Sequence, residues 1–305
     1  MASKLRGAVR SKRKSQLFLL ALCCGLMVLP PAGIAQVQQP PVSAPGESFV
    51  LHEGVTYRTV DGEALLADIY LPKGHGPFPA VIYLHGGGWR NGNRKQLRRQ
   101  ATLMAQKGVA GVAIEYRLAP AHPYPASLDD AKSAVRWMRQ HAKEYHIDGD
   151  HIGAVGSSAG GYLAAMLGVE STPPASAGRD RGDEDASVEA VVALNGVFDL
   201  SAMPPTTMIS DFLGESCAAT ASKCAEASPV QHVRAGLPPF LILHGTADQT
   251  APYSQAVAFV DRLRKTNNRA EMFVAAGAPH TFWAQPEWTK ASFASMSEFL
   301  LETLR

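Results

Sequence analysis

The sequence of 305 residues is poor in cysteine, and it lacks both internal repeats and a glycine-rich nucleotide-binding motif. Only four cysteines occur and none stands in a cluster with histidines, so no metal site is expected. No motif calls for a nucleotide or any other cofactor. The chemistry of the protein is therefore expected to come from its side chains and backbone alone.

Long hydrophobic runs are almost absent as well. The one clear run, residues 17–29, follows six basic residues and is ended by Pro30. It is shorter than the roughly 20 apolar residues that a transmembrane helix needs. Residues 33–35, Gly-Ile-Ala, place small side chains where a signal peptidase cleaves. We therefore predict that residues 1–35 are a signal peptide, that the protein is secreted or periplasmic, and that it is not stably inserted in a membrane.

An excess of positive charge is also missing once this leader is set aside. The leader carries six of the 29 lysine and arginine residues and none of the 27 acidic residues, which leaves a net charge of −4. No basic patch remains that would suggest binding to nucleic acid.

Two cysteines, Cys217 and Cys224, lie beyond the leader in a polar, alanine-rich segment. An exported protein folds in an oxidising compartment. We therefore predict a disulfide bond between these two residues, with a pair of free thiols as the alternative.

What the sequence does contain is a G-x-S-x-G pentapeptide at residues 156–160. The run 151–155 before it is typical of a short buried strand, and the run 161–167 after it is typical of a helix built from small residues. At such a junction the turn is strained and the serine hydroxyl points outward, because side chains in place of the glycines would collide with the crossing chain. Ser158 is therefore the candidate nucleophile. The alternative is a tight turn whose serine only caps the next helix.

A second motif, His-Gly-Gly-Gly-Trp at residues 85–89, follows the apolar run 81–84. Consecutive glycines after a strand can turn backbone N–H groups toward a reacting carbonyl oxygen, where side chains would block its approach. The alternative is a flexible turn.

Two further loops follow predicted strands and carry an acid and a base. Asp248 comes after the apolar run 239–243, and His280 lies between the last predicted strand and the final amphipathic helix. A serine hydroxyl needs an imidazole base, and the imidazole needs a carboxylate that fixes its tautomer. The order Ser158, Asp248, His280 along the chain is that of the α/β-hydrolases.

Other residues compete for these roles. Asp199 also follows a strand and is an alternative acid, although we expect it to line the site. We expect His244 to make a structural contact in the loop that presents the acid, and His85 to brace the glycine loop. Asp129 and Asp130 stand at the start of a predicted helix, where carboxylates act as caps.

These motifs resemble those of the α/β-hydrolase superfamily, in particular the carboxylesterases of the hormone-sensitive-lipase type and the bacterial feruloyl and acetyl-xylan esterases. The resemblance runs from about Gly54 to the C-terminus, and it is carried by residues 68–72, 85–89, 116–120, 148–161, 227–229 and 241–248. It implies that Ser158 is the nucleophile, Asp248 the acid and His280 the base. It also implies that the oxyanion is held by the backbone N–H groups of Gly86, Gly87 and Ala159.

Three positions depart from the pattern of these relatives. Glu115 stands where relatives often carry Asp or Asn, and Ser157 replaces an aspartate that is common in the lipase-like branch. Ala278-Pro279 precedes His280 where Gly-x-Gly is usual. None of these changes removes a catalytic group, but they weaken assignment to one substrate subgroup.

The predicted order of elements is that of an α/β-hydrolase fold, a mostly parallel eight-stranded sheet with helices on both faces. Residues 36–50 are rich in Pro, Gln and Ser and are expected to form a disordered lead-in to a single domain at 51–305. Asp61-Gly62 marks a hairpin, after which strands and helices alternate. Strands are predicted at 80–84, 110–115, 151–155, 188–194, 239–243 and 270–275, and helices near 95–107, 127–145, 159–169, 253–266 and 287–303.

Two long loops interrupt this alternation. Residues 171–187 are polar and are expected to be a mobile surface excursion. Residues 199–228 lie where this fold inserts a lid, and residues such as Met208 and Phe212 would give them an apolar face toward the site. A satellite core under a long loop is the alternative.

The sequence as a whole predicts a secreted serine hydrolase that cleaves carboxylic esters through an acyl-enzyme. Its expected substrates are short-chain acyl esters, or small-molecule and polysaccharide-linked esters such as acetyl and feruloyl esters. The alternatives are an amide or formamide hydrolase that uses the same triad, and a catalytically silent binding module with the same fold.

Overall fold

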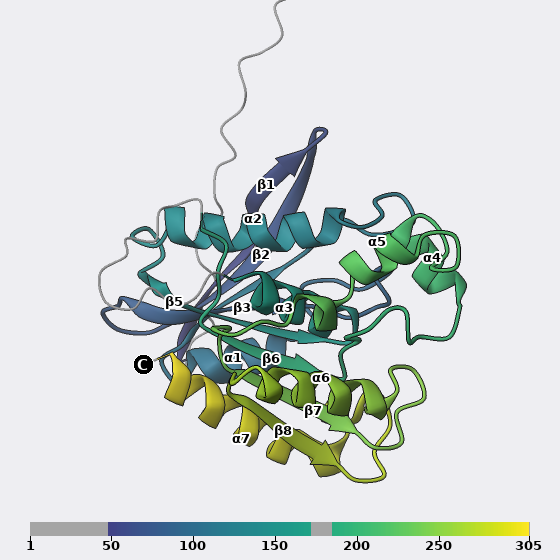
Figure 1. Cartoon of the computed structure of the whole chain (residues 1–305). Coiled ribbons are helices and arrows are strands. Elements are labelled where there is room, and N and C mark those ends of the chain that lie inside the picture. Colours follow the sequence, from purple (N-terminus) through teal and green to yellow (C-terminus); the bar gives the residue numbers. More distant parts are fainter. Residues whose placement is uncertain (1–47, 172–184, 305) are drawn as a thin grey trace, which may run out of the picture. The chain divides into compact units, whose positions relative to one another are not determined.

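The computed structural model describes residues 48–171 and 185–304 (Figure 1). The predicted signal peptide, most of the predicted lead-in and most of the excursion at 171–187 lie outside the described residues. The first strand already begins at Phe49, before the predicted domain boundary at residue 51. Phe49 is buried against Tyr70 of the neighbouring strand, so the core of the domain includes residues before 51.

The eight strands form one sheet in the order β1-β2-β4-β3-β5-β6-β7-β8, as the family resemblance implies. The pairs β1–β2 and β2–β4 are antiparallel and all later pairs are parallel. The strands are β1 (Phe49–Val60), β2 (Glu63–Pro72), β3 (Phe78–Leu84), β4 (Ala110–Ile114), β5 (Ile147–Ser157), β6 (Ala190–Leu194), β7 (Phe240–Gly245) and β8 (Ala270–Ala275).

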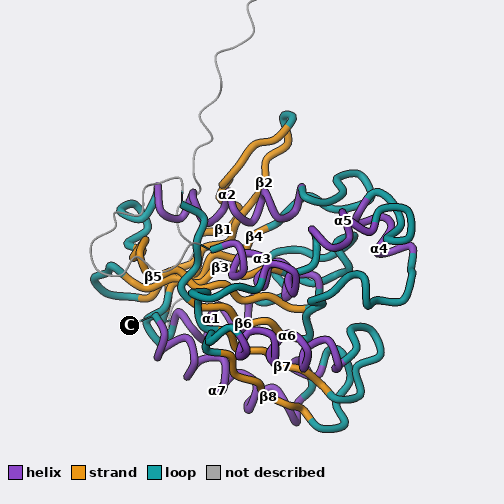
Figure 2. The backbone as a smooth tube through the Cα atoms, viewed as in Figure 1, coloured by secondary structure: helices purple, strands orange, loops and turns teal. Residues whose placement is uncertain are grey.

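Helices cover both faces of this sheet (Figures 1 and 2). The helices are α1 (Arg98–Ala105), α2 (Ala126–Gln140), α3 (Ala159–Glu170), α4 (Thr207–Leu213), α5 (Ala221–Glu226), α6 (Tyr253–Lys265) and α7 (Pro286–Thr303), with short 3-10 turns at Pro229–His232 and Phe282–Ala284. Alternate residues of β3 show the two layers: Ile82 packs in the core under α2, α3 and α6, and Tyr83 in the core under α1 and α7. None of the helices in the described ranges is both long and apolar enough to cross a bilayer.

The largest difference from the predicted elements lies between α2 and β5. The helix ends at Gln140, not near 145, and the strand begins at Ile147, not at 151. The chain reverses through His146, whose φ is 52°, and the carbonyl of His146 accepts the N–H of Phe78. This hydrogen bond pairs the start of β5 with Phe78 of β3, which is distant in sequence. β5 therefore begins earlier than the local pattern predicted.

The segment 199–228 contains α4 and α5, and a disulfide bond joins Cys217, in the loop between these helices, to Cys224 of α5. The predicted pairing of the two cysteines is therefore present. Ile209, Phe212 and Leu213 of α4 are buried and belong to the main core, so the segment is packed on the domain.

Candidate active site

Ser158 stands on a sharp turn between β5 and α3, with φ 53° and ψ −118°. A Cβ added to Gly156 would lie 2.0 Å from the carbonyl oxygen of Gly160, and one added to Gly160 would lie 2.0 Å from that of Leu84. Only glycines therefore permit this turn. The N–H of Ser158 donates to the carbonyl of Leu194 at 2.9 Å, which ties the turn to the end of β6.

The structure brings the three predicted triad side chains together. His280 Nε2 lies 2.8 Å from Ser158 Oγ, and His280 Nδ1 lies 2.7 Å from Asp248 Oδ2. A carboxylate only accepts hydrogen bonds, so Nδ1 carries the proton and Nε2 is left to accept the serine hydroxyl. This is the arrangement in which the imidazole can act as a base toward Ser158.

Asp248 is held in its charged form by its surroundings. Burial by itself would raise the pKa of this carboxyl, but hydrogen bonds from His244, His280 and the Ala251 N–H outweigh burial and bring the pKa well below its usual range. The N–H groups of Thr250 and Ala251 donate to Oδ1 at 2.8 and 2.9 Å. Asp248 is therefore ionised near neutral pH.

His244 contacts the loop that presents Asp248, as predicted. Its Nε2 lies 2.8 Å from the carbonyl oxygen of Ala251 and 3.1 Å from Asp248 Oδ2. Both partners are acceptors, so Nε2 carries a proton. The side chain is fully buried, and it closes the turn that carries the acid.

The oxyanion loop, residues 86–88, differs from the prediction at its first residue. The N–H of Gly86 donates to Gln96 Oε1 at 2.5 Å, so it does not face a substrate. In the described part of the chain, no hydrogen-bond acceptor is found for the N–H groups of Gly87, Gly88 and Ala159. Gly88, the third glycine of the same motif, therefore replaces Gly86 among the candidate donors. The motif contained this signal, but only the contact with Gln96 distinguishes the glycines.

His85 braces this loop as predicted. Its ring stacks on Tyr116 with centroids 4.2 Å apart, and Nδ1 donates to the carbonyl of Gly86 at 2.8 Å. Burial lowers the pKa of His85 to about 4, with the hydrogen bond to Gly86 opposing the shift. The ring is therefore neutral near pH 7 and places no charge behind the oxyanion loop.

Helix α4 lies directly against the oxyanion loop. A Cβ on Gly88 would meet Met208 Sδ at 2.6 Å, and the ring of Phe212 stacks on Trp89 with centroids 4.2 Å apart. Arg90 and Asp211 form an ion pair at 2.8 Å. Helix α4 thus contacts each of the three consecutive residues 88–90, and it forms a wall beside the predicted oxyanion donors.

The other predicted candidates form their hydrogen bonds and ion pairs with residues outside the triad. Asp199 accepts hydrogen bonds from Ser201, and its backbone carbonyl accepts one from the side chain of Gln255. Asp129 lies in the first turn of α2, as expected. Asp130, expected to be a cap, is instead a fully buried carboxylate that pairs with arginines of the β1–β2 hairpin and of the loop after β4.

One residue beside the base was missed by sequence reasoning. Asn195 follows β6, and its side-chain amide nitrogen lies 3.1 Å from His280 Nε2. No local motif surrounds it that would have indicated a role. Its position becomes evident only when the ends of β6 and β7 are seen side by side.

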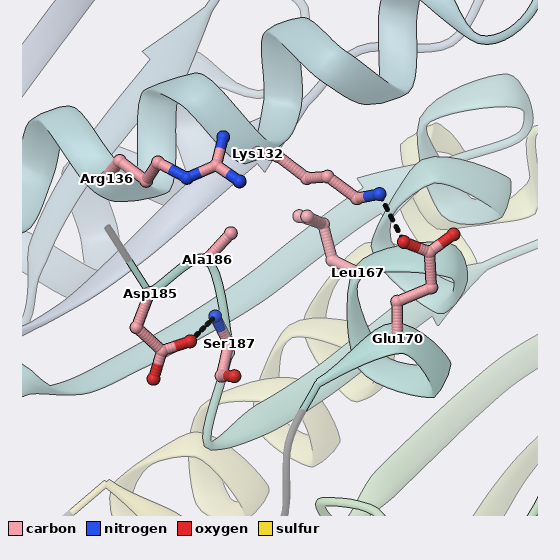
Figure 3. Close-up of a pocket in the computed structure, with 7 residues that line it drawn as sticks. All are labelled: Lys132, Arg136, Leu167, Glu170, Asp185, Ala186 and Ser187. Atoms are coloured by element: carbon pink, nitrogen blue, oxygen red, sulfur yellow. Dashed lines mark hydrogen bonds and ion pairs between the residues drawn. The ribbon is translucent and has the colours of Figure 1, made fainter. Parts of the chain in front are cut away.

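A separate cavity of about 230 Å³ lies between α2 and α3 and is lined by Lys132, Arg136, Leu167, Glu170, Asp185, Ala186 and Ser187 (Figure 3). Lys132 and Glu170 form an ion pair across it. It contains none of the triad residues and borders the segment 172–184, which the structure does not describe, so we assign no function to it. Within the described ranges, no group of three or more metal-ligating side chains is found.

The sheet order, the serine turn and the Ser158–His280–Asp248 contacts define an α/β-hydrolase. More narrowly, the chain belongs to the BD-FAE family, which matches residues 67–263.

Comparison with known proteins agrees with this family. The chain is 33% identical over 234 residues to esterase LipC of Mycobacterium tuberculosis, a match that covers 73% of this chain and 58% of LipC. It is 33% identical to the probable carboxylic ester hydrolase LipM of the same organism, covering 65% of this chain and 48% of LipM. The chain thus spans about half the length of these curated relatives.

Solved structures of the esterase Est2 from Thermogutta terrifontis are similar over nearly their whole length. The propionate-bound form has a TM-score of 0.70 and 31% identity, and the match covers 85% of this chain and 94% of that one. A form phosphonylated by sarin also has a TM-score of 0.70 and 31% identity, with 86% of this chain and 96% of that chain covered.

Proposed function

We propose that this protein is a serine carboxylic-ester hydrolase that works through an acyl-enzyme. The observation that carries the proposal is the chain of hydrogen bonds from Ser158 through His280 to Asp248, beside backbone N–H groups that have no acceptor within the described residues. Similarity to LipC, LipM and Est2 supports ester hydrolysis over the amide alternative and over a silent binding module.

The proposed reaction has two halves. Ser158 Oγ attacks the ester carbonyl while His280 Nε2 takes its proton, and the N–H groups of Gly87, Gly88 and Ala159 bind the oxyanion. His280 then returns the proton to the leaving alcohol. In the second half it activates a water molecule, which releases the acid and restores the serine.

We further propose that the substrates carry short acyl groups such as acetyl. Met208 packs against Gly88, so the wall formed by α4 stands close to the carbonyl that the oxyanion donors would bind. The structure of the relative Est2 with propionate bound supports a small acyl group. The predicted signal peptide supports secretion, and with it an environmental or polysaccharide-linked ester, including feruloyl esters.

The test is the initial rate of hydrolysis on a matched panel: p-nitrophenyl acetate, butyrate and decanoate, methyl ferulate, acetylated xylan and p-nitroacetanilide. We expect fast turnover of the acetyl ester and slow turnover of the decanoate and of the anilide. Ser158→Ala should lower kcat on every substrate by about 10⁴-fold or more, because the remaining site lacks the nucleophile.

An organophosphate supplies the control for the nucleophile. It should add one phosphoryl group to the wild-type protein and none to Ser158→Ala, as measured by mass spectrometry. Ester turnover that persists in Ser158→Ala would overturn the serine mechanism. Anilide hydrolysis faster than ester hydrolysis would instead favour the amidase alternative.

A further inference from the structure

Asn195 follows β6, which lies in the sheet between β5, which leads to Ser158, and β7, which leads to Asp248. Asn195 is fully buried and has a φ of 44°, in the region that non-glycine residues rarely adopt. Its N–H donates to the carbonyl of Leu243 in β7 at 2.8 Å, and the carbonyl of the preceding Leu194 accepts the N–H of Ser158. The backbone at 194–195 therefore connects the nucleophile turn to the strand that leads to Asp248.

The side chain of Asn195 points at the base. Its Nδ2 lies 3.1 Å from His280 Nε2 and 3.3 Å from Nδ1, whereas its Oδ1 is buried without a hydrogen-bond partner. Nδ1 already donates to Asp248, so only Nε2 has a lone pair to offer. The hydroxyl of Ser158 uses that lone pair at 2.8 Å. Because Asn195 Nδ2 is almost equally far from both ring nitrogens, the amide lies against the ring and not along this lone pair.

The His280 ring becomes positively charged when the proton of Ser158 moves to it. As Ser158 Oγ attacks, its proton passes to Nε2, which then has no lone pair and becomes a donor. The amide N–H group against the ring would then be repelled by the positive charge, whereas a half-turn of the amide would place the partly negative Oδ1 against the imidazolium. Oδ1 is buried and has no hydrogen-bond partner, so turning the amide breaks no hydrogen bond of that oxygen.

We propose that Asn195 is a positioning residue for His280, which packs its amide against the ring in the free enzyme and turns Oδ1 toward the ring when the imidazolium forms. This inference rests on the proposed ester-hydrolase function. Among the described residues, the polar contacts of the ring are with Asp248 at Nδ1, with Ser158 at Nε2 and with Asn195 beside both nitrogens. His244 contacts the carboxylate of Asp248. Asn195 is thus an uncharged partner, distinct from the nucleophile, that can respond to the charge of the ring.

Glycine at this position separates the side chain from the backbone. Asn195→Gly keeps the positive φ without strain but removes the amide, whereas alanine would add strain of its own. Asn267 offers a matched control, since it is an exposed asparagine with a φ of 59° at the end of α6. Asn267→Gly should leave catalysis unchanged.

The experiment measures kcat and KM on p-nitrophenyl acetate across pH, together with the His280 titration followed by NMR, for wild type, Asn195→Gly, Asn195→Asp and Asn267→Gly. We expect Asn195→Gly to lower kcat by about 10- to 100-fold with KM changed little, because the contact of the amide oxygen with the charged ring is lost. Asn195→Asp should move the NMR midpoint of His280 and the acid limb of kcat/KM upward by about one pH unit or more, because a carboxylate favours the imidazolium.

The two readouts separate this inference from the function on which it rests. A wild-type protein inactive on all esters would overturn the proposed function, while the NMR midpoints would still test Asn195. If Asn195→Gly keeps the wild-type kcat and Asn195→Asp leaves the His280 titration in place, Asn195 serves the backbone alone and the inference is wrong.

Discussion

His85 shows how a single buried side chain couples the oxyanion loop to pH. Its pKa is about 4 in the folded protein, against an ordinary value near 6.5 in an unfolded chain. Between these values the unfolded chain binds a proton that the folded protein excludes. The stabilisation due to the neutral ring is therefore complete above about pH 6.5 and is lost as the pH falls toward 4.

This residue-scale effect predicts the behaviour of His85→Asn, which keeps a donor for Gly86 but cannot titrate. On acidification from about pH 7.5 to pH 5, the wild type should lose about 2 kcal/mol more unfolding free energy than the variant. Urea unfolding at the two pH values measures the difference. An equal loss in both proteins would show that protonation of His85 does not cause the acid sensitivity.

At the scale of elements, α4 is held on the oxyanion loop by aromatic packing. The ring of Phe212 contacts Trp89, Tyr162 and Tyr124, and the carbonyl of Phe212 accepts the N–H of Tyr124 at 2.6 Å. The disulfide lies beyond the end of α4, between Cys217 and α5. The segment 199–228 is therefore packed on the domain. Phe212, which we call the aromatic anchor, contacts Trp89 next to the oxyanion loop, whereas the disulfide lies outside α4.

Phe212→Ala should accordingly lower the unfolding free energy by about 3–5 kcal/mol, as for other buried aromatic rings. Release of α4 would also move Met208 away from Gly88, so we expect the ratio of decanoate to acetate turnover to rise. The double variant Cys217→Ser, Cys224→Ser keeps the anchor and should retain the wild-type ratio. If the disulfide variant changes that ratio and Phe212→Ala does not, the assignment of the anchor is wrong.

At the scale of the whole described domain, a buried ion cluster connects the antiparallel edge of the sheet to the helical layer. Asp130 of α2 accepts hydrogen bonds from Arg58 of β1 at 2.5 Å and from the side chain of Arg117 at 2.9 Å. It also accepts the backbone N–H of Arg117 at 2.9 Å. The carboxylate is fully buried and is the common partner of both arginines. Its loss therefore leaves two cations unpaired at this place.

Asp130→Ala should therefore reduce the unfolding free energy by about 3 kcal/mol. Since none of its partners touches Ser158 or His280, kcat at a temperature where the variant is folded should stay near that of the wild type. Glu302→Ala, which removes an exposed partner of Arg269, is the control and should not measurably change stability. A stability change as small for Asp130→Ala would contradict the structural role given to the cluster.

Much of the site could be predicted from the sequence because it is built from local patterns at the ends of strands. The glycine spacing around Ser158 forces the turn, and parallel strands present Asp248 and His280 at the same edge of the sheet. The hairpin at Asp61-Gly62 and the alternation of strands and helices likewise follow from short-range signals. These features depend on backbone sterics and on chain order, which the sequence contains directly.

The rest was decided by contacts between residues far apart in the chain. Only the tertiary structure shows that Gln96 occupies the N–H of Gly86, that α4 packs on Gly88, and that Asp130 is an ion-pair partner and not a cap. Asn195 lies 85 positions before His280 and carries no local motif, yet the sheet places the two side chains in contact. Hydrogen-bond partners of this kind depend on three-dimensional proximity, which no pattern of neighbouring residues encodes.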